Sequence, residues 1–401
     1  MVAKTYANRL AIFIQAIFIH ASSGSLIPSV SLFLQRSTLR GPDLIIPTVN
    51  RSSFLKFLIL PLLLQTASSE VTNEGHAAEP VHKIAFGSCY NPRDKRDAIF
   101  EGILSHQPDL FVFLGDNIYG DTKDMAVLKK KYAELEAVKG FQKLRASTRL
   151  LATWDDHDYG INDGGNSYSK REESEAIFLD FFKVPATSPR RKREGIYGAY
   201  TFGPPGKICQ LILLDTRYFR DVLPRKKGPK KPGTVGWYEP TKDKSLTLLG
   251  EAQWAWLEKQ LQIPADVRII GSSIQVLASD KGMENWGNVP HEQERLFDLL
   301  KKHRAHGTFA ISGDVHFTEL SKVQIGDYPF YDFTSSGMSH TSKSWSKAAN
   351  SRRLGESYSF LNAGLIEIDW NNRKIELSAL KADGEKVAPK VIPLKELTFS
   401  E

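Results

Sequence analysis

The sequence has very little cysteine. Cys89 and Cys209 are the only two cysteines among 401 residues, so at most one disulfide can form and a disulfide-rich scaffold is excluded. Cys209 lies in an apolar run, 207–214, that is typical of a buried strand, whereas Cys89 ends a strand at a position suited to chemistry. An exported protein permits a disulfide between them, but we expect two unpaired cysteines with separate roles.

An excess of positive charge is also absent from most of the chain. The formal net charge is +7, but residues 1–69 hold six Lys and Arg against one acid, so the remainder carries 47 − 45 = +2. This balance gives no support to nucleic-acid binding. The 41% hydrophobic and 25% charged content is ordinary for a globular protein of one or two domains.

No apolar run near the N-terminus is long enough for a membrane span. Residues 51–56 are basic, 57–64 are apolar and 67–69 are small, which is the order found in a secretory signal. We expect a signal at about 49–69 behind an upstream extension, a short linker at 70–80 and a catalytic domain at 81–401. The alternative is an uncleaved segment that anchors the protein in a membrane. The expected location is periplasmic or extracellular.

From Val81 onward, short apolar runs alternate with amphipathic ones, which predicts a layered α/β domain. Strands are expected at 82–86, 110–114, 150–154, 211–214, 268–271 and 309–312. Helices are expected at 97–105, 125–144, 172–182, 250–262 and 292–303. Residues 365–370 and 374–380 flank Asn371 and Asn372 as in a hairpin, so the sheets should be mixed.

Four segments that carry acids, His, Cys or Tyr directly follow predicted strands. They are Gly87–Cys89, Gly115–Asp121, Trp154–Tyr159 and Ser312–His316. Parallel neighbouring strands would bring all four to one edge of the sheets, where α/β proteins place their chemistry. A single Gly-Asp after a strand is commonly only a turn, but four such segments together indicate a functional site.

The ligand types indicate a mixed metal cluster. The carboxylates of Asp116, Asp156 and Asp314 suit hard cations, whereas a Cys thiolate, a Tyr phenolate and an imidazole favour a transition metal, most naturally iron. Two ions bridged by aspartates lower the pKa of bound water and hold a phosphoryl oxygen. His157, which lies among the acids, is best placed to protonate the leaving alkoxide.

At these residues the chain resembles the PhoD-like phosphatases, the alkaline phosphatase D branch of the metallophosphatases. The matching segments are 87–89, 115–119, 154–158, 214–217, 249–257 and 312–316, in the same order from about Lys83 to Val387. The resemblance implies two mixed β-sheets flanked by helices and an iron (Fe3+) and calcium centre that hydrolyses phosphate esters. It implies the metal ligands Cys89, Asp116, Tyr119, Asp156, Asp314 and His316, with Asn162 and Arg217 as substrate contacts.

The leading hypothesis is therefore an exported phosphomonoesterase or phosphodiesterase that acts on small phosphate esters. One alternative is a phospholipase D-like diesterase, which Trp237, Tyr238 and Trp345 would help to dock on lipid head groups. Another is a non-catalytic protein that binds phosphate or metal on the same scaffold. Retention of His157 together with every candidate ligand argues against this second alternative.

Overall fold

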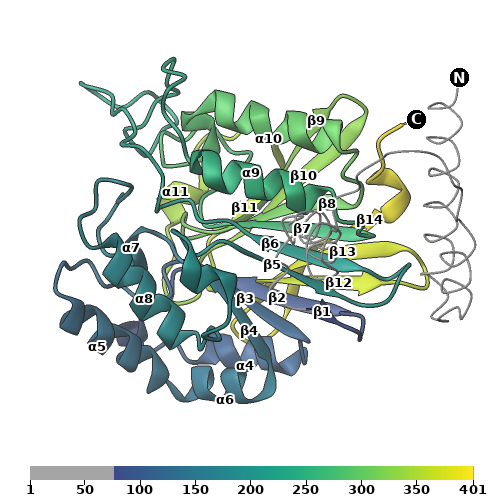
Figure 1. The fold of residues 1–401 in the computed structure, drawn as a ribbon, viewed down its shortest axis with the longest axis horizontal. Helices are drawn as coiled ribbons and strands as arrows, with labels where there is room; N and C mark the ends of the chain where they lie inside the picture. The colour runs from purple at the N-terminus through teal and green to yellow at the C-terminus, as the bar shows by residue number, and fades with distance from the viewer. Residues whose placement is uncertain (1–75, 401) are drawn as a thin grey trace, which may run out of the picture. The chain divides into compact units, whose positions relative to one another are not determined.

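The computed structural model describes residues 76–400. The predicted upstream extension, signal segment and the start of the linker therefore lie outside the described residues. Within residues 76–400, none of the helices has the length and apolar character needed to cross a membrane. This part of the chain forms two β-sheets packed face to face, with helices on both outer faces (Figure 1).

The first sheet has eight strands and is mixed, as the sequence predicted. Its order is β1 (His76–Ala77), β5 (Gly198–Phe202), β6 (Cys209–Leu213), β7 (Val267–Ser272), β8 (Thr308–Ser312), β10 (Tyr328–Ser335), β9 (Thr318–Ile325) and β11 (Arg353–Tyr358). Strands β6, β7, β8 and β10 are parallel neighbours, and β1 is parallel to β5, whereas the pairs β5–β6, β9–β10 and β9–β11 are antiparallel.

The second sheet has six strands. Its order is β14 (Lys386–Pro393), β13 (Lys374–Lys381), β12 (Asn362–Asp369), β2 (Lys83–Gly87), β3 (Leu110–Leu114) and β4 (Arg149–Thr153). Strands β2, β3 and β4 are parallel, and β12 to β14 add an antiparallel edge. The predicted hairpin is confirmed as β12 and β13, whose turn is fixed by a hydrogen bond from the amide of Asn372 to Asp369 (3.0 Å).

Helices cover the outer faces of both sheets. Helices α4 (Ala98–Ser105), α5 (Met125–Glu136), α6 (Lys139–Ser147) and α8 (Arg171–Phe181) cover the six-stranded sheet, and α9 (Gly250–Leu261) and α10 (Pro290–Lys302) cover the other (Figure 1). Two one-turn helices, α7 (Asp156–Tyr159) and α11 (Lys343–Ser346), and four 3-10 segments lie in the loops. The latter are η1 (Pro92–Asp94), η2 (Pro189–Lys192), η3 (Trp286–Asn288) and η4 (Leu394–Glu396).

The prediction of one helix over residues 125–144 is wrong. The chain forms α5 and α6 instead, because Val138 has an extended backbone between them. The break lets α6 approach α4 closely. A Cβ atom on Gly140 would lie 2.7 Å from the ring of Phe100, so only glycine permits this contact.

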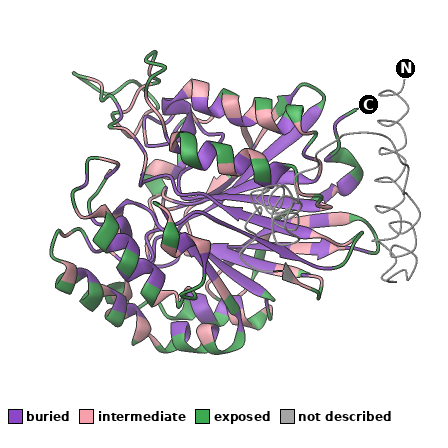
Figure 2. Cartoon of the chain, viewed as in Figure 1, coloured by how far each residue is buried: buried purple, intermediate pink, exposed green. Residues whose placement is uncertain are grey.

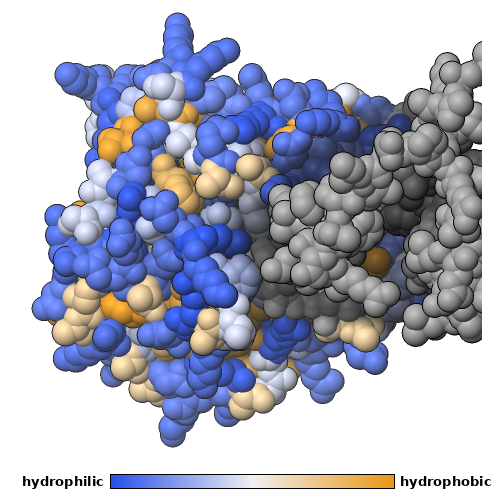
Figure 3. Space-filling view, in the orientation of Figure 1, coloured by the Kyte–Doolittle hydropathy of each residue, from blue (hydrophilic) through white to orange (hydrophobic). Residues whose placement is uncertain are grey.

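The core lies between the two sheets and beneath the helices. Every residue of β3, β6, β7 and β8 is buried, which explains why the sequences of these strands are mostly apolar (Figure 2). The surface facing the viewer in Figure 3 is mostly hydrophilic, with apolar residues in scattered patches. Both cysteines are buried and unpaired, as predicted.

Asp215, which follows β6, ties the two sheets together. Its Oδ1 atom accepts hydrogen bonds from Trp154 Nε1 at the end of β4 (2.8 Å) and from the amides of Arg217 and Tyr218 (2.9 Å each). Gln253 of α9 holds the backbone of Asp215 through two hydrogen bonds of 2.8 and 2.9 Å. The ends of β4 and β6 are therefore fixed side by side.

We predict that Asp215→Ala lowers the free energy of unfolding by about 3 kcal/mol or more, because several buried donors lose their acceptor at about 1–3 kcal/mol each. Urea unfolding of the metal-free protein measures this change. Asp298→Ala is the control: it removes an exposed Asp298–Lys301 pair and should change stability by about 0.5 kcal/mol or less. Equal effects of the two variants would contradict the role of Asp215.

Candidate metal centre

The four predicted segments meet at the carboxyl ends of β2, β3, β4 and β8. Four of the predicted ligands lie in the left-handed region of the backbone, with φ of 59° at Cys89, 49° at Asp116, 73° at Asp314 and 58° at His316. Such a conformation costs a non-glycine residue on the order of 1–3 kcal/mol and is concentrated at functional sites. The sharp turns point these side chains to one region between the sheets.

The first group of donors contains Cys89, Asp116, Tyr119 and His316. One ligand atom each of Cys89, Asp116 and His316 lies within 4.8 Å of the others. The Tyr119 hydroxyl lies 3.4 Å from Asp116 Oδ2 and 3.4 Å from His316 Nε2, and Cys89 Sγ lies 3.4 Å from the same Asp116 atom. Neighbouring N or O ligands about 2.0–2.1 Å from one ion are roughly 3 Å apart, so this spacing fits a metal.

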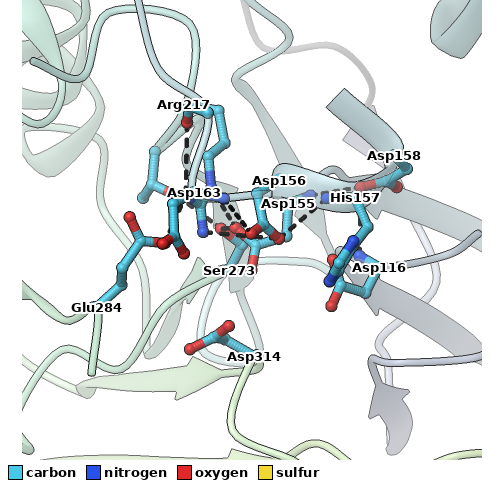
Figure 4. Close-up of polar contacts among 12 residues, drawn as sticks. Asp116, Asp155, Asp156, His157, Asp158, Asp163, Arg217, Ser273, Glu284 and Asp314 are labelled. Atoms are coloured by element: carbon cyan, nitrogen blue, oxygen red, sulfur yellow. Dashed lines mark hydrogen bonds and ion pairs between the residues drawn. The ribbon is translucent and has the colours of Figure 1, made fainter. Parts of the chain in front are cut away.

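The second group contains only carboxylates. Ligand atoms of Asp155, Asp156 and Asp314 lie within 4.8 Å of one another, and Asp156 also joins Asp116 in a third group with His157 (Figure 4). Three of these oxygens, Asp116 Oδ1, Asp155 Oδ2 and Asp314 Oδ2, are inaccessible to solvent and have no hydrogen-bond partner. Because a buried carboxylate oxygen without a donor is costly, a bound cation is the fitting partner.

The electrostatics of the cluster agree with this conclusion. Burial raises the pKa of Asp116, Asp155 and Asp314, and neighbouring carboxylates raise it further. Burial opposes ionisation of Asp156 as well, but the charges of Arg217 and His157 lower its pKa to about 2. Most of the acids are thus destabilised as anions without a cation, and the donor set fits a metal centre.

Asp155 is held by two side chains from the segments that follow β6 and β7 of the eight-stranded sheet. Arg217 Nε lies 2.5 Å from Asp155 Oδ1, and Ser273 Oγ donates to the same oxygen at 2.6 Å. The other side of the Arg217 guanidinium binds Glu284 at 2.7 Å, and Arg220 binds the same carboxylate at 2.7 Å. These contacts join the end of β4 to the segments that follow β6 and β7 (Figure 4).

The two predicted substrate contacts, Arg217 and Asn162, have different surroundings. The Arg217 side chain is fully buried, so the guanidinium supports Asp155 and Glu284 and is not presented to a substrate in this structure. Asn162 is exposed on the loop after α7, and no hydrogen bond joins it to the predicted ligands among residues 76–400. Its neighbour Asp163 contacts the site instead, through its amide and Asp156 Oδ2 (2.7 Å).

His157 lies at the edge of the donor groups on α7. Its Nδ1 atom is 2.8 and 2.9 Å from the two carboxylate oxygens of Asp121, and its ring lies 4.3 Å from the ring of Tyr119. Burial lowers the pKa of His157, but the hydrogen bond to Asp121 and the charges of Asp116 and Asp156 raise it to about 10. The metal-free imidazole is therefore protonated at neutral pH.

Sequence reasoning missed several residues of the site. Asp158 accepts from the amide of Asp155 (2.6 Å) and from Asn117 Nδ2 (2.5 Å), so it fixes the turns after β3 and β4. His340 lies 2.8 Å from the Tyr119 hydroxyl. The sequence feature that could have indicated His340 is the aromatic strand at 328–335. This strand is followed by Ser336 and Gly337, and His340 lies three residues beyond that glycine.

Comparisons with known proteins agree with this fold. The family model described as PhoD-like phosphatase matches residues 84–359, well over half of the chain. A search of curated protein sequences gave no match. The chain is similar to a solved structure of PhoD, with 16% identity, a TM-score of 0.60 and coverage of 79% of this chain and 69% of that one.

A second similar structure is GAP50, described as the anchor in the inner membrane complex of Plasmodium. It has 14% identity and a TM-score of 0.52, with coverage of 80% of this chain and 90% of that one. At these identities the two structures show the shared fold, whereas the match to the family model shows the family. The chain belongs to the PhoD-like phosphatase family and is a metal-dependent hydrolase that acts on phosphoric esters.

Proposed function

We propose that this protein is an exported enzyme that hydrolyses small phosphate esters at a mixed iron and calcium centre, with His157 as the general acid. The observation that carries the proposal is the convergence of four strand ends on one region, where Cys89, Asp116 and His316 form one donor group and the aspartates form another. His157 adjoins both groups, which is the position a proton donor requires.

The two donor groups differ in the metal they favour. A thiolate, a phenolate and an imidazole at Cys89, Tyr119 and His316 suit iron, whereas the carboxylates of Asp156 and Asp314 suit calcium, with Asp116 between the groups. When bound, such ions polarise a phosphoryl oxygen and lower the pKa of a coordinated water. The protein's own contribution is to hold these side chains in place.

His157 is oriented for proton transfer by its neighbours. Because the Asp121 carboxylate accepts a hydrogen bond at Nδ1, the proton on that nitrogen is fixed and Nε2 is the atom available to a leaving group. The side chain is 19% exposed, so a substrate reaches it from the surface. If His157 Nε2 donates its proton to the departing alkoxide, the leaving group departs as a neutral alcohol and not as a strongly basic anion.

His157→Ala should lower turnover of alkyl phosphate esters by about 100-fold or more, because their leaving group needs a proton. Activated aryl esters such as p-nitrophenyl phosphate should lose less, because their leaving group is stable as an anion. Steady-state kinetics on both substrates, with metal content measured in parallel, test this difference. Equal losses on both would assign His157 to metal binding or structure instead.

The metal assignment predicts a coloured protein. Tyr119→Phe should remove a phenolate-to-iron absorption band, and Cys89→Ser should weaken iron retention because a hydroxyl is a poorer ligand than a thiolate. A chelator should remove calcium, and activity should return with calcium and not with zinc. Cys209→Ser is the matched control, since Cys209 is buried in β6 outside the donor groups. A colourless, fully active protein that contains only zinc would contradict the assignment.

One structural observation favours a second candidate substrate, a lipid phosphodiester. The side chain of Trp237 is exposed, at 42%, on the loop that also carries Tyr238, and Tyr238 donates a 2.7 Å hydrogen bond to Asp163 beside the site. An exposed aromatic near the site suits docking on a head group. A panel of monoesters, soluble diesters and phospholipids distinguishes the candidates. If none of these esters is hydrolysed, the result supports a non-catalytic protein on the same scaffold; GAP50, which has a similar fold, is described as an anchor.

Export is part of the proposal and rests on the sequence of residues 51–69. We predict that N-terminal sequencing of protein recovered from outside the cytoplasm begins near Glu70, because the small residues 67–69 precede that position. A cytoplasmic product that still contains residues 54–64 would contradict export. A membrane-bound product that retains them would support the uncleaved anchor.

A further inference from the structure

His340 and Asp94 lie beside the metal centre, and the proposed function gives them no role. His340 belongs to the loop that follows β10, and Asp94 ends η1. His340 Nε2 lies 2.8 Å from the hydroxyl of Tyr119 and 3.3 Å from His316 Nε2. The hydrogen bond to Tyr119 is shorter than either of the 3.4 Å contacts that the same hydroxyl makes with Asp116 and His316.

Asp94 orients the His340 ring. Its Oδ2 atom lies 3.1 Å from His340 Nδ1 and accepts a 2.8 Å hydrogen bond from Ser339 Oγ, which is itself 2.9 Å from His340 Nδ1. Because a carboxylate oxygen only accepts, His340 Nδ1 carries the proton and the Nε2 lone pair faces Tyr119. This is the arrangement in which a carboxylate fixes the tautomer and direction of a histidine at a metal site.

The loop that carries His340 is attached to the strand end that carries Cys89. The amides of Met338 and Ser339 donate to the carbonyl oxygens of Ser88 and Cys89, each at 3.2 Å. The amide of Asn91 donates to Ser339 Oγ at 2.8 Å. The same piece of backbone therefore places Cys89 and His340, so the distance from His340 to the donor group is fixed by the fold.

From these contacts, and resting on the proposed metal centre, we infer that Asp94 and His340 form a positioning unit for Tyr119. The unit holds the phenol oxygen at the place shared with Asp116 and His316, so that Tyr119 is aligned before a metal binds. Without it, the hydroxyl keeps the two 3.4 Å contacts and the ring keeps its packing against His157, so placing the phenol oxygen costs part of the metal affinity. Partners of this kind typically contribute about 10- to 100-fold in metal affinity.

The side chains of His340 and Asp94 are 32% and 33% exposed, so substitutions at these positions should leave the core undisturbed. His340→Phe keeps a ring and removes both nitrogens, and we expect the purified protein to release its metal to a chelator about 10- to 100-fold faster. His340→Gln should restore part of the loss, because its amide can bond to the Tyr119 hydroxyl. The matched control is His303→Gln, which changes a histidine paired with Glu258 at 3.0 Å and should release metal at the wild-type rate.

A double variant tests whether His340 acts through Tyr119. In the Tyr119→Phe background, His340→Phe should change the release rate by less than about 2-fold, because the hydroxyl that it positions is gone. If the two substitutions instead multiply each other's effects, His340 supports the metal or the fold directly and the inference is overturned. In an iron-loaded protein, a shift of the phenolate band in His340→Phe provides a second readout.

The outcomes separate this inference from the proposed function. A wild-type protein that binds no metal overturns the metal centre and the positioning unit with it. A wild-type protein that binds metal and releases it at the same rate as His340→Phe overturns the positioning unit alone. If His340→Phe does not fold, Asp94→Ala makes the same comparison, and an unchanged release rate in that variant is equally decisive against the unit.

Discussion

The structure depends on the burial of negative charge where the two sheets meet. The side chains of Asp116, Asp155, Asp156, Asp158 and Glu284 are all buried there. Burying a charge costs several kcal/mol unless it is paired, and Arg217 and Arg220 compensate only part of the group. The remaining charge is neutralised by protons or by bound cations, so metal binding and the stability of this edge of the sheets are physically linked.

The positions of the ligands depend on the packing of the core. Left-handed backbone at Cys89, Asp116, Asp314 and His316 is unfavourable, and it persists because the strands before these residues are fixed. Those strands are buried on both faces and pair in parallel within their own sheets. The hydrophobic core thus supplies the stability that keeps the ligands in place.

The family motifs divide into two kinds of residue. Asp215 and Gln253 belong to matching segments but lie in the frame, where they hold the ends of β4 and β6. Arg217 extends this frame to Asp155. The residues of the three donor groups belong to the other kind, because each offers a ligand atom to the others, and Asp155 belongs to both kinds because its Oδ1 atom also accepts from Arg217 and Ser273. Similarity at a motif therefore does not by itself distinguish a residue that supports the site from one that performs the chemistry.

The sequence by itself determined the α/β class, most strand positions and the four strand ends that meet at the site, because continuous apolar runs and Gly-Asp turns are local signals. It did not determine the break between α5 and α6, where extended backbone at Val138 lets Gly140 of α6 pack against Phe100 of α4. The tertiary structure alone decided that Arg217 is buried and that His340 meets Asp94, a residue 246 positions away. Such contacts arise from the packing of distant segments, and no local pattern of residues encodes them.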